Sequence, residues 1–468
     1  MRLAGVRLAG ARLAGAMALS RLAGSLARRS GRGGGTSLPG RLLLRLAPGA
    51  ITQLAGRLSR GSVVISATNG KTTTAAMVAS ILGGEGIAAV HNRAGANMTG
   101  GVASTLLGAA TLRGEGMRGD LGLFEVDELW LDELVEALRP RALVLGNLFR
   151  DQLDRYGELE TIGDRWAGVL ANAPPDLTPV LCADDPLISA LGGESPGQPL
   201  WFGVGDDAPT LGELPHASDS THCRRCGQPL VYEAVYLGHL GRYSCPTGDH
   251  DRPDPAVSAT RVELSGVRTS AFILTTPAGT RRVRLPLPGL YNVYNALAAA
   301  ALATALDVTL DAVVAGLESV APAFGRAETI PLGDRQLSVL LVKNPTGANE
   351  VLRTLASEPG EHDLLAVLND GIADGRDVSW VWDADFELLA GHLRQVTCAG
   401  TRAAEMALRL KYAGVDPARI RVADGLAGAL DAALADGAGP LYALPTYTAL
   451  LELRELLSRR GAAPEYWR

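Results

Sequence analysis

The sequence predicts an α/β protein with a parallel-sheet central domain, followed by a second α/β domain at the C-terminus. Short apolar runs typical of buried strands alternate with helical runs along most of the chain. One of them, residues 63–65, leads through a polar turn into an Ala-rich helical run from Thr73 to Leu82. Strands that alternate with helices form parallel sheets with helices on both faces. The length of 468 residues fits two or three domains.

Composition excludes several classes of protein. Hydrophobic residues make up 47% of the chain and charged residues 20%, with a net charge of −6, which is typical of a globular protein and argues against a general nucleic-acid binder. No apolar run is long enough to span a bilayer. Five unevenly spaced cysteines do not form a disulfide framework and indicate a reducing compartment.

Lysine is scarce. Of 44 basic residues only three are lysines, namely Lys71, Lys343 and Lys411. A lysine kept in such an arginine-rich chain is a candidate for chemistry that a guanidinium group cannot perform, although chance is an equal explanation for any single one. Lys411 lies in an amphipathic helical run, and we expect it to be exposed.

Residues 1–60 contain no acidic residue and repeat Arg-Leu-Ala-Gly. Arginines five residues apart step around a helix rather than line one face, so the segment makes a poor amphipathic anchor. We expect a loose basic leader, and contact with anionic lipid stays open.

The central domain is expected over residues 61–325 and the C-terminal domain over residues 326–468. A polar stretch rich in Gly and Pro, about residues 215–255, interrupts the central domain and carries three of the cysteines. Further strands are expected at residues 121–126, 142–146, 179–182, 261–276 and 282–287 before the boundary, and at 337–342, 363–368, 395–399 and 441–443 after it; helices are expected at residues 131–138 and from Tyr291.

The turn after residues 63–65 reads Ala67-Thr68-Asn69-Gly70-Lys71-Thr72-Thr73. A strand before it and a helix after it are the context of a phosphate-binding loop, in which backbone N–H groups wrap the phosphates and a lysine reaches their oxygens. We predict that Thr68, Asn69, Gly70, Lys71, Thr72 and Thr73 bind ATP, with the Thr72 hydroxyl on Mg²⁺. The first glycine of the general pattern is replaced by Ile65, and an ordinary strand–turn–helix is the alternative.

This loop resembles the ATP loop of the Mur ligase family, and the resemblance continues along the chain. The matching stretches are residues 91–99, 125–128, 147–158, 184–186, 287–295 and 325–328. It implies that Glu125 holds the Mg²⁺ of ATP and acts in catalysis, and that Asn295 and Arg326 contact the nucleotide. Gln152 stands where most Mur ligases carry a histidine.

Gln152, the cysteine insertion and the C-terminal half together look like the MurT branch of that family, the ligase-like subunits of lipid II isoglutaminyl synthases. The resemblance implies ATP-dependent amidation of the α-carboxyl of D-glutamate in the lipid II stem peptide, giving D-isoglutamine through an acyl phosphate. It also implies a GatD-type glutamine amidotransferase subunit as the source of ammonia. The expected location is the cytoplasm, at the inner face of the membrane, with no nucleic acid bound.

The inserted cysteines suggest a zinc-ribbon-like module. Cys223 and Cys226 form a knuckle that can share one Zn²⁺ with Cys245. The branch has a fourth cysteine that this chain lacks, so we expect His250 to replace it, then Asp249 or His222. The module is expected to be structural, and a degenerate ribbon without metal is the alternative.

Two C-terminal stretches complete the expected site. Lys343 follows a predicted strand, and we expect it to contact phosphate or the acyl phosphate; a solvated loop charge is the alternative. The resemblance implies that an aspartate of the loop Asp370–Asp377 completes the catalytic Cys-His pair of the glutaminase subunit. Asp377 is our first choice as this catalytic residue, ahead of Asp374.

Two rival functions stay open. One is an amino-acid-adding Mur ligase or a folylpolyglutamate-type ligase, against which stand Gln152, the cysteine insertion and the Asp370–Asp377 loop. The other is a regulatory nucleotide-binding module that has lost catalysis. The substitutions at Gln152 and at Ala67, where the family usually has glycine, favour that second rival.

Overall fold

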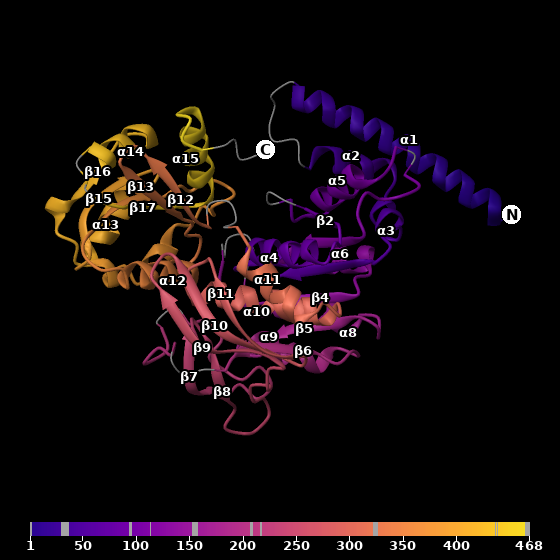
Figure 1. Ribbon diagram of the computed structural model, residues 1–468, viewed down its shortest axis with the longest axis horizontal. Helices are drawn as coiled ribbons and strands as arrows, with labels where there is room; N and C mark the ends of the chain where they lie inside the picture. The colour runs from indigo at the N-terminus through magenta and orange to yellow at the C-terminus, as the bar shows by residue number, and fades with distance from the viewer. Residues whose placement is uncertain are drawn as a thin grey trace.

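Two α/β domains form the molecule, each built on an open β-sheet with helices around it, as the computed structural model shows (Figure 1). The described residues are 2–29, 37–92, 96–112, 114–151, 158–205, 209–215, 218–321, 326–435, 437 and 439–463. Among these residues no helix has the length and apolar character needed to cross a bilayer.

The central domain is built on a nine-stranded sheet of order β11-β10-β9-β6-β5-β4-β1-β3-β2. Its strands are β1 (Ser62–Ser66), β2 (Ala89–His91), β3 (Leu121–Glu125), β4 (Ala142–Leu145), β5 (Thr178–Cys182), β6 (Leu200–Val204), β9 (Val257–Ser265), β10 (Thr269–Thr276) and β11 (Gly279–Leu285). The strands from β2 to β9 pair in parallel, whereas β10 pairs antiparallel with both of its neighbours. The expected parallel sheet is therefore present, with an antiparallel edge that the expectation did not include.

Helices from distant parts of the chain cover this sheet. They are α4 (Lys71–Gly84), α5 (Thr99–Ala109), α6 (Leu131–Leu138), α8 (Leu159–Ala171), α9 (Pro186–Ala190), α10 (Leu290–Ala305) and α11 (Leu310–Glu318), with the short η1 (Glu128–Trp130) and η2 (Leu191–Glu194). Helix α10 packs on β5, β6, β9 and β10 and on α4, so a helix from the end part of the domain lies beside the helix that follows the phosphate-binding loop. All five residues of β1 are buried, as expected for a strand covered on both faces.

The N-terminal segment is helical, so the expectation of a loose leader was wrong. It folds as α1 (Arg2–Arg29), α2 (Leu38–Leu46) and α3 (Ala50–Ala55), with α1 along the outer side of α2 and α5 (Figure 1). Two of the repeated arginines hold it there. Arg12 donates to the carbonyl of Leu46 at the end of α2, and Arg21 donates to the carbonyls of Leu107 and Ala110 at the end of α5. Carbonyls at helix C-termini lack partners within the helix, which is why these guanidinium groups bind there.

The cysteine insertion contains a two-stranded antiparallel sheet of β7 (Val231–Leu237) and β8 (Leu240–Ser244). Its small core is Cys223, Leu230, Tyr243 and Cys245. The turn of the hairpin reaches the C-terminal domain, since a Cβ on Gly238 would lie 3.1 Å from the Thr346 side chain. The insertion therefore connects both domains.

The C-terminal domain has a six-stranded sheet of order β12-β13-β17-β14-β15-β16. Its elements are β12 (Arg326–Leu332), β13 (Arg335–Leu340), α12 (Pro345–Ala356), β14 (His362–Val367), η3 (Ser379–Trp382), η4 (Phe386–Leu389), β15 (Leu393–Ala399), α13 (Ala403–Tyr412), η5 (Pro417–Arg419), β16 (Ile420–Val422), α14 (Leu426–Ala435), β17 (Leu441–Pro445) and α15 (Tyr447–Arg459). Alternate residues of β14 enter two separate cores: Leu364 packs with α12 and α13, whereas Leu365 packs with α14 and α15. This confirms helices on both faces of the sheet.

Candidate active site

The phosphate-binding loop lies at the carboxyl end of β1, between β3 and β4. Gly70 begins α4 with φ of +89°, and a Cβ at this position would lie 1.9 Å from Oδ1 of Asn295. Only glycine fits a left-handed conformation with such a close neighbour. The loop is also tied to the strand beside it, because Asn69 N–H donates to Asn147 Oδ1 (2.9 Å) and Asn147 Nδ2 donates to the Asn69 carbonyl (3.1 Å).

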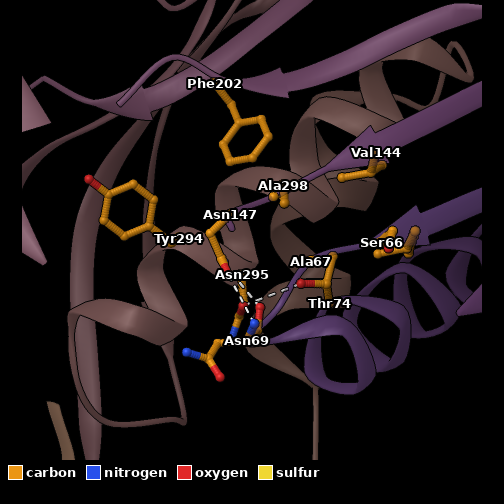
Figure 2. Close-up of a pocket in the computed structure, with 12 residues that line it drawn as sticks. Ser66, Ala67, Asn69, Thr74, Val144, Asn147, Phe202, Tyr294, Asn295 and Ala298 are labelled. Carbon is orange, nitrogen blue, oxygen red and sulfur yellow. Dashed lines mark hydrogen bonds between the residues drawn. The ribbon is translucent and has the colours of Figure 1, made fainter. Parts of the chain in front are cut away.

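Asn295 reaches the loop from α10. Its Nδ2 donates to Asn292 Oδ1 (3.1 Å), and its Oδ1 accepts from the Thr74 hydroxyl (3.4 Å). Asn292 in turn donates to the Pro288 carbonyl. Figure 2 shows Asn295 beside Asn69 and Thr74 at the edge of a pocket that is also lined by Phe202 and Tyr294. The sequence-predicted Asn295 thus supports the loop from the far end of the domain.

Lys71 forms a buried ion pair with Glu128, at 3.0 Å between Nζ and Oε2. Its Nζ also donates to the Ala67 carbonyl. Burial raises the pKa of Glu128, while the positive charges of Lys71 and Lys343 act in the opposite direction. Glu128 therefore holds the lysine ammonium within the loop, where a phosphate oxygen can replace the carboxylate as its partner.

Thr72 and Glu125 present oxygen atoms side by side at the mouth of the loop. The Thr72 hydroxyl donates to Glu125 Oε1 at 3.0 Å. Asn92 fixes the end of β3, since it accepts from the Glu125 N–H (2.9 Å) and donates to the Glu125 carbonyl (2.7 Å). A hydroxyl and a carboxylate are the hard oxygen ligands that Mg²⁺ binds beside a nucleotide, so this pair fits the expected ion.

The C-terminal domain adds a second lysine to the same region. Lys343 forms an ion pair with the buried carboxylate of Asp151, which follows β4. Burial lowers the pKa of Lys343, but the charges of Asp151, Glu128 and Asp127 outweigh this and raise it. Lys343 and Lys71 therefore act on the same buried carboxylate, Glu128.

A pair of asparagines joins the loop to the C-terminal domain. Asn344 Nδ2 donates to Asn69 Oδ1 (3.0 Å), and Asn69 Nδ2 donates to Asn344 Oδ1 (3.3 Å). The same Asn344 oxygen caps α12 by accepting from the Gly347 N–H (2.8 Å). One side chain thus starts a helix of one domain and contacts the phosphate-binding loop of the other.

The three cysteines of the insertion come together. The sulfur atoms of Cys223, Cys226 and Cys245 lie within 4.8 Å of one another. The Thr247 hydroxyl lies 2.9 Å from Cys245 Sγ and lowers the pKa of that thiol to about 6. It also donates to the Asp249 carboxylate at 2.7 Å. Three thiols with a carboxylate close by fit the donor set of a tetrahedral zinc site.

His250 lies outside this cluster, contrary to its choice as the fourth ligand. Its Nε2 is 2.8 Å from the hydroxyl of Ser189 in α9, and its ring packs edge-on against Tyr243. Burial lowers the pKa of His250 to about 4. The imidazole connects the insertion to the central domain because its buried nitrogen finds a partner there rather than at the thiols.

The three aspartates of the loop Asp370–Asp377 lie in different environments. Asp374 is buried and accepts from the backbone N–H groups of Gly371 and Thr448. Asp370 accepts from Arg402 at 2.8 Å. Asp377 is exposed and accepts from the Ser379 N–H (2.8 Å); hydrogen bonds from the backbone and side chain of Ser379 lower its pKa. Of the three, Asp377 has the carboxylate that faces solvent.

Two predicted residues cannot be placed in the site. Arg326 begins β12, but its side chain is outside the described part of the structure, as is Gln152 altogether. Other residues have a larger part in the site than the sequence predicted. Glu128 and Asp151 lie in stretches noted for their resemblance, and Asn344 follows the predicted Lys343. Their pairing with lysines and with Asn69 depends on the tertiary fold.

The class of protein follows from comparison with known structures. The fold is that of Mur ligases and folylpolyglutamate synthases. A pseudomurein peptide ligase type C from Methanothermus fervidus superposes with a TM-score of 0.64 at 22% identity, over 87% of this chain and 80% of the other. Mycobacterium tuberculosis folylpolyglutamate synthase, complexed with ADP and AMPPCP, gives 0.63 at 18% identity, over 89% of this chain and 96% of the other. A family model of the Mur ligase middle domain matches residues 65–223.

Sequence relatives then define the family. The chain is 32% identical to the MurT subunit of lipid II isoglutaminyl synthase (glutamine-hydrolyzing) from Streptococcus pneumoniae, over 95% of this chain and 98% of that protein. The subunit of the same name from Staphylococcus aureus is 31% identical over 94% of this chain and 97% of its own length. A model of the MurT ligase C-terminal domain matches residues 341–450. The chain belongs to the MurT family of Mur ligases.

Proposed function

We propose that this protein is the ligase subunit of a lipid II isoglutaminyl synthase. It amidates the α-carboxyl of D-glutamate in the lipid II stem peptide to D-isoglutamine, at the expense of ATP and with ammonia from glutamine. The observation that carries the proposal is the match to MurT subunits along almost their whole length, in a chain whose phosphate-binding loop places Gly70, Lys71 and Thr72 at the start of α4.

The residues of the loop suit activation of a carboxylate. Lys71 and Thr72 begin α4, whose N-terminal amide groups favour phosphate, and Lys343 adds a positive charge from the other domain. When bound at Thr72 and Glu125, Mg²⁺ supplies charge neutralisation for the transferring phosphoryl group. The substrate carboxylate attacks the γ-phosphate of ATP, ADP leaves, and ammonia displaces phosphate from the resulting acyl phosphate. Asn295 and Arg326 are proposed to contribute to nucleotide binding.

A GatD-type glutamine amidotransferase subunit is the proposed partner, and Asp377 is the proposed contribution of this chain to its active site. The exposed carboxylate of Asp377 is bound to the adjacent Ser379 and can orient a histidine of another subunit, whereas the buried Asp374 is held by Gly371 of its loop and by Thr448 of α15. The complex is proposed to act in the cytoplasm, at the inner face of the membrane, since lipid II is anchored in the bilayer.

Amidation of lipid II, followed by mass spectrometry of the stem peptide, tests the function. We expect amide formation with ATP and ammonium salt alone, and with glutamine once the glutaminase subunit is added. Lys71→Ala should abolish both reactions. Asp377→Asn should abolish only the glutamine-driven reaction, and Asp383→Asn, another exposed aspartate nearby, serves as its control. Unchanged glutamine-driven activity in Asp377→Asn would refute the role of Asp377.

The same assay separates the rival functions. An amino-acid-adding ligase would need a free amino acid and would ignore ammonium. A regulatory module would form no product with either nitrogen source, although it would still bind ATP. Either result would reject the synthase.

Zinc is proposed to hold the insertion together through Cys223, Cys226 and Cys245, with Asp249 as the fourth ligand. Asp249 was the second choice from the sequence, beside His222, and two hydrogen bonds of the Thr247 hydroxyl link its carboxylate to the Cys245 thiol. Metal analysis should find one zinc per chain, lost in Cys223→Ser/Cys226→Ser and retained in His250→Gln. Zinc-free protein from a zinc-replete preparation would reject the site.

A further inference from the structure

Helix α1 has two apolar faces, and only one of them is covered. Leu13, Ala16, Met17 and Ser20 are buried against the domain. On the opposite face Leu19, Leu22 and Leu26 follow one another at spacings of three and four residues. Their side chains are 56%, 59% and 57% exposed, respectively. Three adjacent exposed leucines on one helix face form an apolar stripe rather than scattered surface residues.

A fourth leucine lies next to this helix. Leu112, which is 86% exposed, follows α5, and its carbonyl accepts a hydrogen bond from Arg21 of α1 at 3.3 Å. Figure 1 shows α1 at the outer edge of the molecule, with α2 and α5 on its inner side. We call Leu19, Leu22, Leu26 and Leu112 the leucine stripe.

The charged residues of the N-terminal segment are all basic, and one exposed carboxylate, that of Glu115, lies in the turn that carries Leu112. Residues 1–60 have no acidic residue. Within the described part of the chain, no arginine of this segment forms an ion pair with a carboxylate; these arginines are Arg12, Arg21, Arg41, Arg45, Arg57 and Arg60. Elsewhere most arginines that the structure describes in the C-terminal domain have such a partner, for example Arg335 with Asp363 and Arg454 with Glu328.

Arg21 illustrates the excess of positive charge. Its contacts are carbonyl oxygens rather than carboxylates. Burial and the neighbouring positive charge of Arg118 both lower its pKa. Two guanidinium groups close together without a carboxylate attract anions from outside the protein.

We propose that α1 binds the surface of an anionic bilayer, with the leucine stripe in the headgroup and upper acyl region and the arginines that lack carboxylate partners near lipid phosphates. An apolar helix face flanked by positive charge is the combination that interfacial helices use, and neither part alone gives stable binding. A protein partner with an acidic rim is the alternative occupant. The mobility of lipid favours the bilayer, because it accommodates a single convex helix without a complementary groove.

Vesicle sedimentation with the full-length chain tests this proposal. We expect binding to vesicles of equal parts phosphatidylglycerol and phosphatidylcholine, little binding to pure phosphatidylcholine, and weaker binding as NaCl is raised. Leu19→Gln/Leu22→Gln/Leu26→Gln should weaken binding at least tenfold. The control Leu264→Gln/Leu388→Gln/Leu408→Gln removes three leucines that are 46%, 38% and 46% exposed in other places, and it should bind as the wild type does.

Three outcomes would overturn the proposal. They are no binding of the wild type to anionic vesicles, equal binding by the stripe variant, and binding of the wild type that is the same for pure phosphatidylcholine as for anionic vesicles. If the stripe variant keeps vesicle binding but no longer co-elutes with the glutaminase subunit, the stripe belongs to a protein interface instead. Circular dichroism and the thermal midpoint confirm that the stripe variant is folded, which is expected because its buried face is untouched. Amidation of a water-soluble stem peptide should be the same in both variants, so failure here is distinguishable from failure of the proposed function.

Discussion

At the scale of single residues, Glu128 provides the negative charge that stabilises the buried ammonium group of Lys71. Both side chains are buried, and a buried ammonium without a negative partner is costly. The pair keeps the lysine inside the loop, close to the position that phosphate takes. Glu128 therefore supplies the negative partner of Lys71 within the loop.

Glu128→Gln should lower the free energy of unfolding of the nucleotide-free protein by about 3 kcal/mol, because it leaves Lys71 buried and unpaired. Magnesium-ATP should stabilise this variant more than it stabilises the wild type, since the phosphates restore a partner. Urea unfolding with and without magnesium-ATP measures both effects. Glu136→Gln, at an exposed position of α6, is the control and should stay within about 0.5 kcal/mol of wild type. Equal stability of Glu128→Gln and wild type would contradict this account.

His250 gives the insertion a dependence on pH. The unfolded chain takes up a proton on this histidine near the ordinary value of 6.5, but the folded chain does so only near a pKa of about 4. Because the unfolded state then binds more protons, stability is lost as the pH falls from about 6.5 to 4.

In His250→Gln this loss should be smaller, by about 2 kcal/mol at the acid end after allowance for solvent screening. Thermal unfolding in a chelating buffer between pH 7 and pH 4 measures it, because the chelator removes any contribution from metal binding. The exposed His222→Gln is the matched control. A pH profile of His250→Gln that follows the wild-type profile would show that His250 is not the group responsible.

At the scale of elements, the start of α12 is the part of the C-terminal domain that contacts the ATP loop. Its first residues lie against Asn69 on one side and against the β7–β8 turn on the other. Asn344 performs two tasks at this point: it caps the helix and it pairs with the loop. These tasks can be separated by side-chain length.

Asn344→Ser should keep the cap but lose the contact with Asn69, because serine is a good N-cap with a shorter side chain. Its stability should stay close to wild type while its KM for ATP rises several-fold. Asn344→Ala should lose the cap as well and be less stable by about 1 kcal/mol. Denaturant unfolding and steady-state kinetics with ammonium distinguish the two variants. A normal KM in both would show that the asparagine pair does not support nucleotide binding.

At the scale of the whole molecule, the ATP site is assembled from both domains and carries more negative than positive groups. Two lysines face four carboxylates, those of Glu125, Asp127, Glu128 and Asp151. The triphosphate adds further negative charge, so a bound cation is required for electrostatic balance. Of the two lysines, Lys343 is the one that the C-terminal domain contributes.

Lys343→Ala should weaken magnesium-ATP binding about tenfold, which corresponds to about 1.4 kcal/mol, because it leaves Asp151 as an unpaired negative charge near the phosphates. Omission of Mg²⁺ should weaken ATP binding to wild type and variant alike. Isothermal titration calorimetry provides the dissociation constants, with the exposed Lys411→Ala as the control. An unchanged affinity in Lys343→Ala would place this lysine outside the nucleotide site.

The sequence alone predicted those parts of the fold that depend on local pattern. Helix α6 has the expected bounds. The strands expected at residues 63–65, 121–126 and 363–368 match β1, β3 and β14 to within one residue at each end. The leader was predicted wrongly because its arginines were judged by their spacing on an isolated helix. In the structure Arg12 and Arg21 bind carbonyls of other helices, which spacing within one helix cannot reveal. The position of His250 away from the thiols could not be predicted for a similar reason, since its partner Ser189 is 61 residues away.

By itself the sequence determined the phosphate-binding loop: a strand, a glycine turn and Lys71-Thr72 at the start of a helix. These suffice for phosphate binding because the turn and the helix N-terminus are local structures. The tertiary structure decided which charges face one another. Lys71 with Glu128, Lys343 with Asp151 and Asn69 with Asn344 are separated by 57, 192 and 275 residues, respectively. Parallel strands bring their carboxyl ends to one edge of the sheet, and the packing of the second domain on that edge completes the site.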